Sequence, residues 1–260
     1  MTVASGKGGV GKTNISMNLA ICLAASGKRI IVIDADLGLG NLDIMMNMSS
    51  QYNLSHVIAE QKSLEQIIRI GPAGVEVICG GSGLEDMANL TPFQHHRLIC
   101  EFNRLQDRSD VILIDTGAGI SRNVMSFCMA ADHTLVVTTP EPAAMTDAYA
   151  VIKVLAARNY PGRISLLINM ANSFEEGKKI YRQIAQVASR FLGLPVYEAG
   201  ILCRDEYLQA AVSRRQPVIL AYPKAPFSRG LKTISNRLTN TAPSRSAEDG
   251  FFRKVVNWFF

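Results

Sequence analysis

Residues 6–13, Gly6-Lys7-Gly8-Gly9-Val10-Gly11-Lys12-Thr13, have the residue types and spacing of a loop that binds phosphate groups. The glycines allow the backbone to curl around a di- or triphosphate with its N–H groups pointing inward. We expect Lys12 to reach the β- and γ-phosphate oxygens, and the Thr13 hydroxyl to ligate Mg²⁺. The pattern therefore predicts that this whole segment binds a nucleotide together with Mg²⁺.

A second lysine in the loop, Lys7, is not required by one nucleotide in one subunit, because Lys12 already supplies the phosphate charge. Lys7 therefore indicates positive charge that is supplied from one subunit to its neighbour.

Two aspartates, Asp36 and Asp115, follow apolar runs that read as strands. In an enzyme with a phosphate-binding loop, one carboxylate near the loop holds the Mg²⁺ shell and another can orient the attacking water. We expect Asp115 to hold the Mg²⁺ shell through a water, and Asp36 to position the attacking water. An aspartate after a strand is usually only a cap or turn residue, but its combination with the loop favours the catalytic interpretation.

The elements that must position these residues are predicted by apolar runs that alternate with helical patterns. The runs are continuously apolar, which is typical of strands covered on both faces in a mostly parallel sheet. Ligands of such sheets bind at the carboxyl ends of the strands. The predicted fold is α/β, a three-layer nucleotide-binding domain. We expect strands at 2–5, 29–34, 74–78, 110–115, 133–138, 164–169 and 196–200, and helices at 13–26, 92–107, 121–130, 143–158, 174–192 and 204–214.

The composition fits one well-packed domain, because 260 residues, 48% of them hydrophobic, can bury a single sizeable core. The net charge of +5 is compatible with nucleic acid or anionic lipid as a partner and establishes neither.

The five cysteines stand singly in the sequence, and we expect buried thiols in a reducing cytosol. No signal peptide precedes the first strand and no apolar run approaches the ~20 residues that span a bilayer, so we expect a soluble chain.

The end of the chain has a different pattern from the rest. Residues 239–250 are polar and small, which predicts a flexible linker after a domain at 1–238. Residues 251–260 project as a short amphipathic helix, too short to span a membrane and suited to an anionic membrane surface. An apolar face docked on the protein's own body is the alternative. The residues expected to contact lipid are Phe251, Phe252, Val255, Val256, Trp258 and Phe259.

The loop at 7–13, with Asp34-Ala35-Asp36 and the segment 115–119, resembles the MinD/ParA group of ATPases, over about residues 2–238 and the tail. The resemblance implies a P-loop NTPase fold in which two subunits sandwich two ATP molecules with Mg²⁺. It implies that Lys7 reaches the partner's nucleotide, that Asp36 supports slow hydrolysis, and that Asn169 contacts adenine. A turn or helix cap is an equally weighted interpretation of Asn169. The resemblance also implies a tail that is released when ATP drives dimerisation, so that the protein moves from the cytoplasm to the inner face of the membrane.

Within this group, the segments at 34–43, 115–121 and 138–149 resemble the FlhG family, whose members regulate the number of flagella. That resemblance implies three kinds of partner: the GTPase FlhF, proteins of the flagellar C-ring, and a flagellar transcription activator. Many members carry a polar N-terminal extension that stimulates FlhF. The printed sequence starts at the first strand, so it does not predict that activity.

Other functions of the same fold remain as alternatives. A MinD-type regulator of the division site would differ by producing minicells on deletion. A ParA-like DNA partition ATPase is favoured only by the net charge of +5, and the hydrophobic tail argues for lipid instead of DNA. An iron–sulfur carrier or reductase could use Cys100 and Cys128, but Cys128 lies in a helical pattern and not in a glycine-rich cluster loop. A bacterial tyrosine kinase would show a tyrosine-rich tail, which this sequence lacks.

Overall fold

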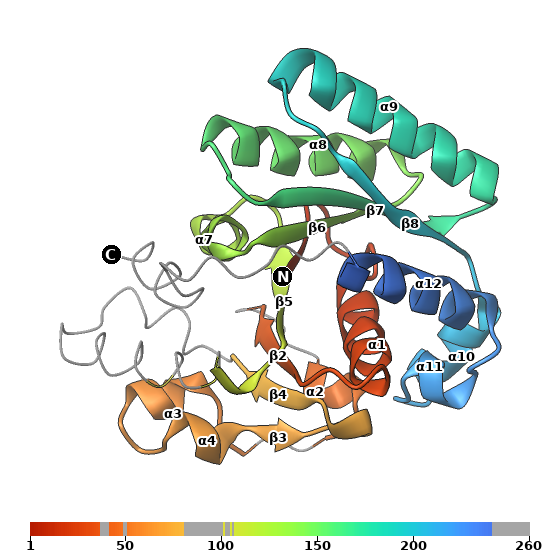
Figure 1. Ribbon diagram of the computed structural model, residues 1–260. Coiled ribbons are helices and arrows are strands. Elements are labelled where there is room, and N and C mark those ends of the chain that lie inside the picture. Colours follow the sequence, from red (N-terminus) through yellow and green to blue (C-terminus); the bar gives the residue numbers. More distant parts are fainter. Residues whose placement is uncertain (37–41, 49–50, 81–100, 102–104, 106, 241–260) are drawn as a thin grey trace.

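A computed structural model describes residues 1–36, 42–48, 51–80, 101, 105 and 107–240 (Figure 1). Within these residues, one sheet holds eight strands in the order β3-β4-β2-β5-β1-β6-β7-β8. Every neighbouring pair is parallel except β3 and β4. The strands are β1 (Thr2–Ser5), β2 (Ile30–Ala35), β3 (Arg69–Ile70), β4 (Glu76–Cys79), β5 (Val111–Ala118), β6 (His133–Thr138), β7 (Arg163–Ala171) and β8 (Tyr197–Cys203).

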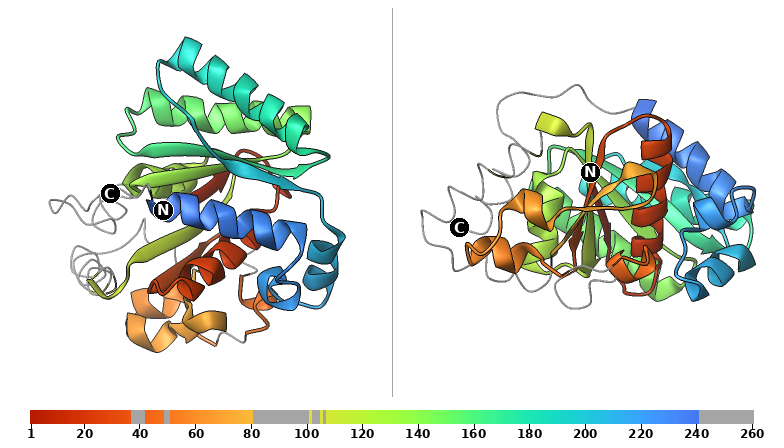
Figure 2. Two further views of the ribbon diagram at one scale, coloured as in Figure 1. Left: turned by 45° about the vertical axis from the view of Figure 1, so that its right-hand side comes forward. Right: turned by 90° about the horizontal axis from the view of Figure 1, so that it is seen from below.

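Helices cover both faces of this sheet (Figures 1 and 2). On one face, α1 packs on β2 and β5, and α12 packs on β8 and on α1. On the other face, α7, α8 and α9 pack on β1 and β5 to β8. The helical elements are α1 (Lys12–Ala25), α2 (Leu42–Met45), α3 (Leu54–Ile58), α4 (Leu64–Ile67), η1 (Pro72–Gly74), α7 (Arg122–Ala130), α8 (Pro142–Ala157), α9 (Phe174–Leu192), α10 (Glu206–Ser213), α11 (Val218–Ala221) and α12 (Pro226–Asn240).

The continuous apolar runs form strands because both of their faces are buried. On β2 and β5, Val32 and Leu113 belong to the core under α1 and α12. Their neighbours Ile33 and Ile114 point to the opposite side, into the core shared with α3, α4 and α7. The sequence-based prediction of a three-layer α/β fold with a mostly parallel sheet is therefore confirmed.

Several elements differ from the sequence-based predictions, which did not include β3, η1, α2, α3, α4 or α11. The strand expected to end at Asp115 continues to Ala118, because the Thr116 hydroxyl donates to Val3 O at 2.9 Å and Gly119 N donates to Ser5 O at 2.8 Å. The sequence reasoning missed α12 entirely, although Phe227, Leu231 and Ile234 form its buried side.

The terminal predictions fall mostly outside the described residues. α12 ends at Asn240, two residues inside the range 239–250 that was predicted as a linker. The remainder of that range and the predicted amphipathic helix at 251–260 lie outside the described residues, as does most of the helix predicted at 92–107. Within 92–107, residues 101, 105 and 107 are described, and they are helical.

The cysteines are only partly as predicted. Cys22 and Cys128 are buried, whereas Cys79 and Cys203 are partly exposed, so the expectation of buried thiols is wrong for the last two. Cys100 lies outside the described residues. In the part of the chain that the structure describes, no helix has the length and apolar character that crossing a membrane requires.

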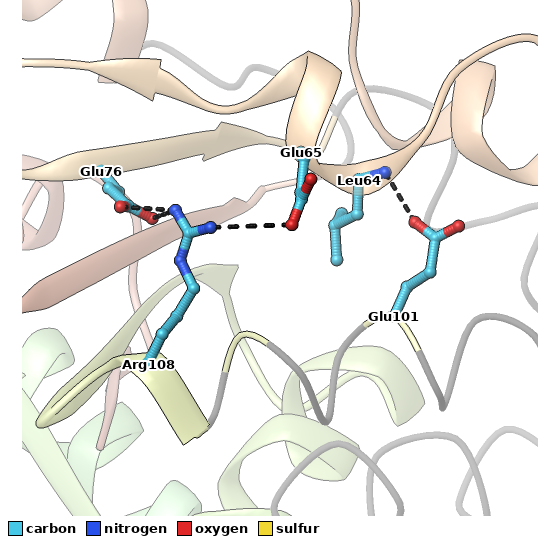
Figure 3. A network of polar contacts seen from close by, with 5 residues as sticks. All are labelled: Leu64, Glu65, Glu76, Glu101 and Arg108. Atoms are coloured by element: carbon cyan, nitrogen blue, oxygen red, sulfur yellow. Dashed lines mark hydrogen bonds and ion pairs between the residues drawn. The ribbon is translucent and has the colours of Figure 1, made fainter.

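Arg108 ties the chain before β5 to the edge of the sheet (Figure 3). Its guanidinium pairs with Glu76 of β4 at 2.6 Å and with Glu65 of α4 at 3.9 Å. Glu101 accepts a hydrogen bond of 2.6 Å from Leu64 N in the first turn of α4. The ion pair between Arg108 and Glu76 is exposed, so it stabilises the fold by no more than about 1 kcal/mol. The effect of these contacts is to fix α4 and β4 beside the segment that leads into β5.

Candidate nucleotide-binding site

The loop at 6–13 leads from β1 into α1, and the first turn of α1 is open to an anion. Gly11 is the N-cap of α1 with φ of 91°, a left-handed conformation that glycine adopts without strain. No side chain caps this end of α1, and the first turn holds no acidic residue. Its N–H groups and the positive end of the helix dipole are therefore available to a phosphate group.

Two neighbouring elements hold the loop in place through its glycines. A β-carbon at Gly6 would lie 2.2 Å from the carbonyl oxygen of Asp147 in α8, so only glycine allows α8 to pack this closely. A β-carbon at Gly11 would lie 2.5 Å from Nδ2 of Asn169 at the end of β7. At Gly8, by contrast, no described atom lies within 4 Å of that position. The loop is thus supported by α8 and by the end of β7, and it is open on the side of Gly8.

Lys12 lies within the site and is almost completely buried, with 8% of its surface exposed. Its ammonium donates a hydrogen bond of 2.8 Å to the Ser5 hydroxyl, which in turn donates to Lys7 O at 2.7 Å. Burial lowers the pKa of Lys12, and the negative charges of Asp115 and Asp36 oppose that shift. A buried ammonium beside an uncapped helix end provides the charge that phosphate oxygens require.

Asp115 is 1% exposed and faces the start of α1. It is hydrogen-bonded to the Thr13 hydroxyl. Ser16, one turn further along α1, donates to Asp115 Oδ1 at 2.9 Å. Burial raises the pKa of Asp115 to about 6, whereas the hydroxyl hydrogen bonds and the charge of Lys12 act in the opposite direction. The structure thus brings the two predicted Mg²⁺ residues, Thr13 and Asp115, into contact.

Asp36 follows the last residue of β2 and lies beside the end of β5. A β-carbon at Gly117 would be 3.4 Å from Asp36 Oδ1, which is ordinary contact distance. Asp36 and Asp115 are close enough for each to influence Lys12 electrostatically. The carboxylate predicted to position water therefore lies on the same side of the sheet as the loop, next to the predicted Mg²⁺ residue.

Lys7 and Asn169 have partners within their own chain. Lys7 forms an ion pair with Glu141, which precedes α8, and both side chains are substantially exposed. Asn169 is 2% exposed, and its Nδ2 donates to Val10 O at 2.8 Å. Because a carbonyl oxygen can only accept, this contact also sets the orientation of the Asn169 amide. Asn169 thus supports the loop, a role that the sequence reasoning did not predict.

The site contains further side chains that the sequence reasoning missed. Ser5 accepts a hydrogen bond from Lys12, and Ser16 donates one to Asp115. Glu141 forms an ion pair with Lys7. Ser16 carried a usable signal, because it lies three residues after Thr13 and so shares its side of the helix. The predicted lipid-binding residues at 251–260 are outside the described residues, so their position relative to this site is not part of the structure.

The donor set fits a magnesium–nucleotide complex. A hydroxyl, a buried carboxylate and a buried ammonium converge at the start of α1. Among the described residues, no group of three or more His, Cys, Asp or Glu side chains could hold a metal ion by itself. Mg²⁺ usually keeps several waters and is bound by one or two protein ligands plus substrate phosphates. Thr13 and Asp115 match that pattern.

The chain is similar to known proteins along most of its length. The family described as AAA domain matches residues 1–159. Antiactivator FleN of Pseudomonas aeruginosa is 38% identical over 238 residues, which cover 92% of this chain and 85% of FleN. Flagellum site-determining protein YlxH of Helicobacter pylori is 31% identical over 265 residues, covering 99% of this chain and 90% of YlxH.

Among solved structures, the septum site-determining protein MinD of Pyrococcus horikoshii, complexed with Mg-ADP, superposes with a TM-score of 0.73. The match covers 91% of this chain and 94% of that one, at 21% identity. At this identity the likeness shows the fold alone, and it agrees with the sheet and helix layers described above.

Proposed function

The chain is an ATPase of the MinD/ParA family, and we propose that it regulates the number or placement of bacterial flagella. The observation that carries the proposal is the identity of 38% to the antiactivator FleN along nearly the whole chain. The similarity to YlxH, which is named for determining the flagellum site, supports the same assignment.

In the proposed reaction, ATP binds with its phosphates on the loop and the first turn of α1. Lys12 supplies charge to the β- and γ-phosphate oxygens, and the glycines bring backbone N–H groups close to them. Thr13 would hold Mg²⁺, and Asp115 would hold it through a water. When bound, Mg²⁺ neutralises charge that develops on the phosphate oxygens. Asp36 orients the water that attacks the γ-phosphorus, and hydrolysis is slow.

We further propose that ATP joins two copies of the chain, with Lys7 of each copy contacting the nucleotide of the other. Lys7 is half-exposed and pairs with Glu141, so it can leave that partner at little cost, since an exposed ion pair contributes no more than about 1 kcal/mol. The gain from contacting a triphosphate exceeds this, because hydrogen bonds between charged groups are stronger.

The dimer would bind the inner face of the cell membrane through the terminal peptide. Phe251, Phe252, Val255, Val256, Trp258 and Phe259 provide the apolar side, and Arg253 and Lys254 face anionic headgroups. One short helix binds weakly, whereas two on one dimer bind far better because the second event is intramolecular. ATP hydrolysis would then return the protein to the cytoplasm.

The proposed protein partners are FlhF, proteins of the flagellar C-ring and a flagellar transcription activator, and DNA is not proposed as a partner.

The test is a deletion strain complemented with the parent gene or with a Lys12→Ala variant. We expect deletion to change the number or position of flagella on each cell, counted by electron microscopy. The parent gene should restore the normal count, and Lys12→Ala should not. Normal flagella together with minicells would contradict the proposal and favour a role at the division site.

A further inference from the structure

A buried carboxylate at the end of β2, Asp34, has no task in the reaction proposed above. Asp34 is 4% exposed, and it is in register with Asp115 on the neighbouring strand β5. Burying a carboxylate is unfavourable unless its oxygens find hydrogen-bond donors. The contacts of Asp34 therefore indicate what it does.

Each oxygen of Asp34 accepts a hydrogen bond from a different backbone N–H. Oδ1 accepts from Asp36 N at 3.2 Å, and Oδ2 accepts from Leu42 N at 3.2 Å. Asp36 and Leu42 are the described residues on either side of 37–41. One side chain thus connects the end of β2 with the start of α2.

The bond to Asp36 N fixes the backbone of the residue whose carboxylate is proposed to orient water. That carboxylate lies beside Gly117 at the end of β5, where a β-carbon, if the residue had one, would be 3.4 Å from Asp36 Oδ1. A shift of the Asp36 backbone would move the carboxylate relative to the end of β5. Misplacement by about 1 Å at a reacting centre can slow a reaction about a hundredfold.

We propose that Asp34 is a positioning residue for ATP hydrolysis, which holds the backbone N–H groups of Asp36 and Leu42 and thereby directs the Asp36 carboxylate. This inference rests on the proposed role of Asp36. The chemistry requires an aspartate, because a carboxylate accepts at both oxygens. An asparagine would turn an NH₂ group towards one of the two N–H groups.

Two variants separate positioning from charge. Asp34→Asn keeps the size of the side chain and loses one acceptor. In assays at pH 8, above the pKa of Asp34, Asp34→Glu keeps the negative charge and both acceptors, but displaces them by the length of one methylene group. If Asp34 acts by position, both variants hydrolyse ATP about tenfold to a hundredfold more slowly, and both bind ATP within about threefold of the parent. Hydrolysis by Asp34→Glu at the parent rate would overturn the proposal, because it would show that charge alone is needed.

A second measurement does not depend on hydrolysis. Amide hydrogen exchange in the nucleotide-free protein should be about fivefold to tenfold faster in Asp34→Asn at whichever of Asp36 and Leu42 then faces the NH₂ group, because that amide loses its hydrogen bond. Unchanged exchange at both amides would overturn the proposal, whatever the rate of hydrolysis. Failure of the parent to hydrolyse ATP would instead refute the proposed function and leave this measurement valid.

Asp43→Asn is the matched control. Asp43 is also an aspartate close to Asp36 and Leu42, but among the described residues its Oδ1 accepts from the neighbouring Ile44 N, in an exposed hydrogen bond of α2. The control should leave exchange at Asp36 and hydrolysis unchanged. A circular dichroism melt of each variant confirms that the compared proteins are folded.

Discussion

Alanine substitutions in the loop test its geometry, because three of its glycines occupy different environments. Gly8 has an ordinary φ, and no described atom would lie within 4 Å of a β-carbon there. Gly9 has a left-handed φ of 78° and the same open space. Gly11 has a left-handed φ of 91°, and its β-carbon would lie 2.5 Å from Asn169 Nδ2. The series adds first a backbone effect and then a steric one.

The expected losses of unfolding free energy follow from these environments. Gly8→Ala should change it by no more than about 0.5 kcal/mol. Gly9→Ala forces a left-handed alanine, which costs about 1–2 kcal/mol, and recovers part of this by restricting the unfolded chain, so the net loss is about 1 kcal/mol. Gly11→Ala adds displacement of the Asn169 amide from Val10 O, which leaves a buried donor and acceptor unpaired and raises the loss to about 3 kcal/mol.

The assay is guanidinium-induced unfolding of the nucleotide-free protein, with equal denaturant slopes required across the series. A double-mutant cycle with Asn169→Ala isolates the contact. In the Asn169→Ala background, Gly11→Ala should cost only the backbone portion of about 1 kcal/mol. Equal losses for Gly9→Ala and Gly11→Ala, or no coupling between Gly11 and Asn169, would refute the packing of β7 against the loop.

Three further predictions concern charge. Lys12→Ala should weaken ATP binding about tenfold to a hundredfold, measured by isothermal titration calorimetry, because charge-assisted hydrogen bonds to phosphate are lost; unchanged affinity would remove Lys12 from the site. Lys7→Ala should bind ATP but remain monomeric in light scattering, while Glu141→Gln, which breaks the same ion pair and keeps the lysine, should still dimerise. Burial and the nearby Asp115 raise the pKa of Asp34 to about 7, so the folded state holds a proton that the unfolded chain releases near pH 4, and the associated stability is lost as pH rises through 7. Between pH 5 and pH 8 the nucleotide-free parent should therefore lose about 2–3 kcal/mol relative to Asp34→Asn, and a constant difference in unfolding free energy would contradict this.

The sequence was sufficient to predict features that depend on local pattern. The loop at 6–13 and the parallel strands of the sheet are set by neighbouring residues and by burial on both faces, so their predicted positions were close to those observed, whereas the short edge strand β3 was not predicted. α12 was also within reach, since Phe227, Leu231 and Ile234 recur at helical spacing after Pro226, but this segment was not recognised as a helix.

Contacts between distant parts of the chain could not be predicted in the same way. The ion pair between Lys7 and Glu141 joins residues 134 positions apart, and the hydrogen bond from Ser16 to Asp115 joins residues 99 positions apart. Single-sequence patterns carry no information about such pairs, because they arise only when the strands take their order in the sheet. For the same reason, the support of the loop by Asn169 became visible only in the structure.

The most direct test of the proposed reaction is to measure ATP binding and ATP hydrolysis in parallel for the parent and for Asp36→Ala, with Mg²⁺ present. The parent should hydrolyse ATP slowly. Asp36→Ala should bind ATP within about threefold of the parent and hydrolyse it about a hundredfold more slowly, because the group that orients the water is removed. Hydrolysis by Asp36→Ala at the parent rate would contradict the assignment of the catalytic carboxylate.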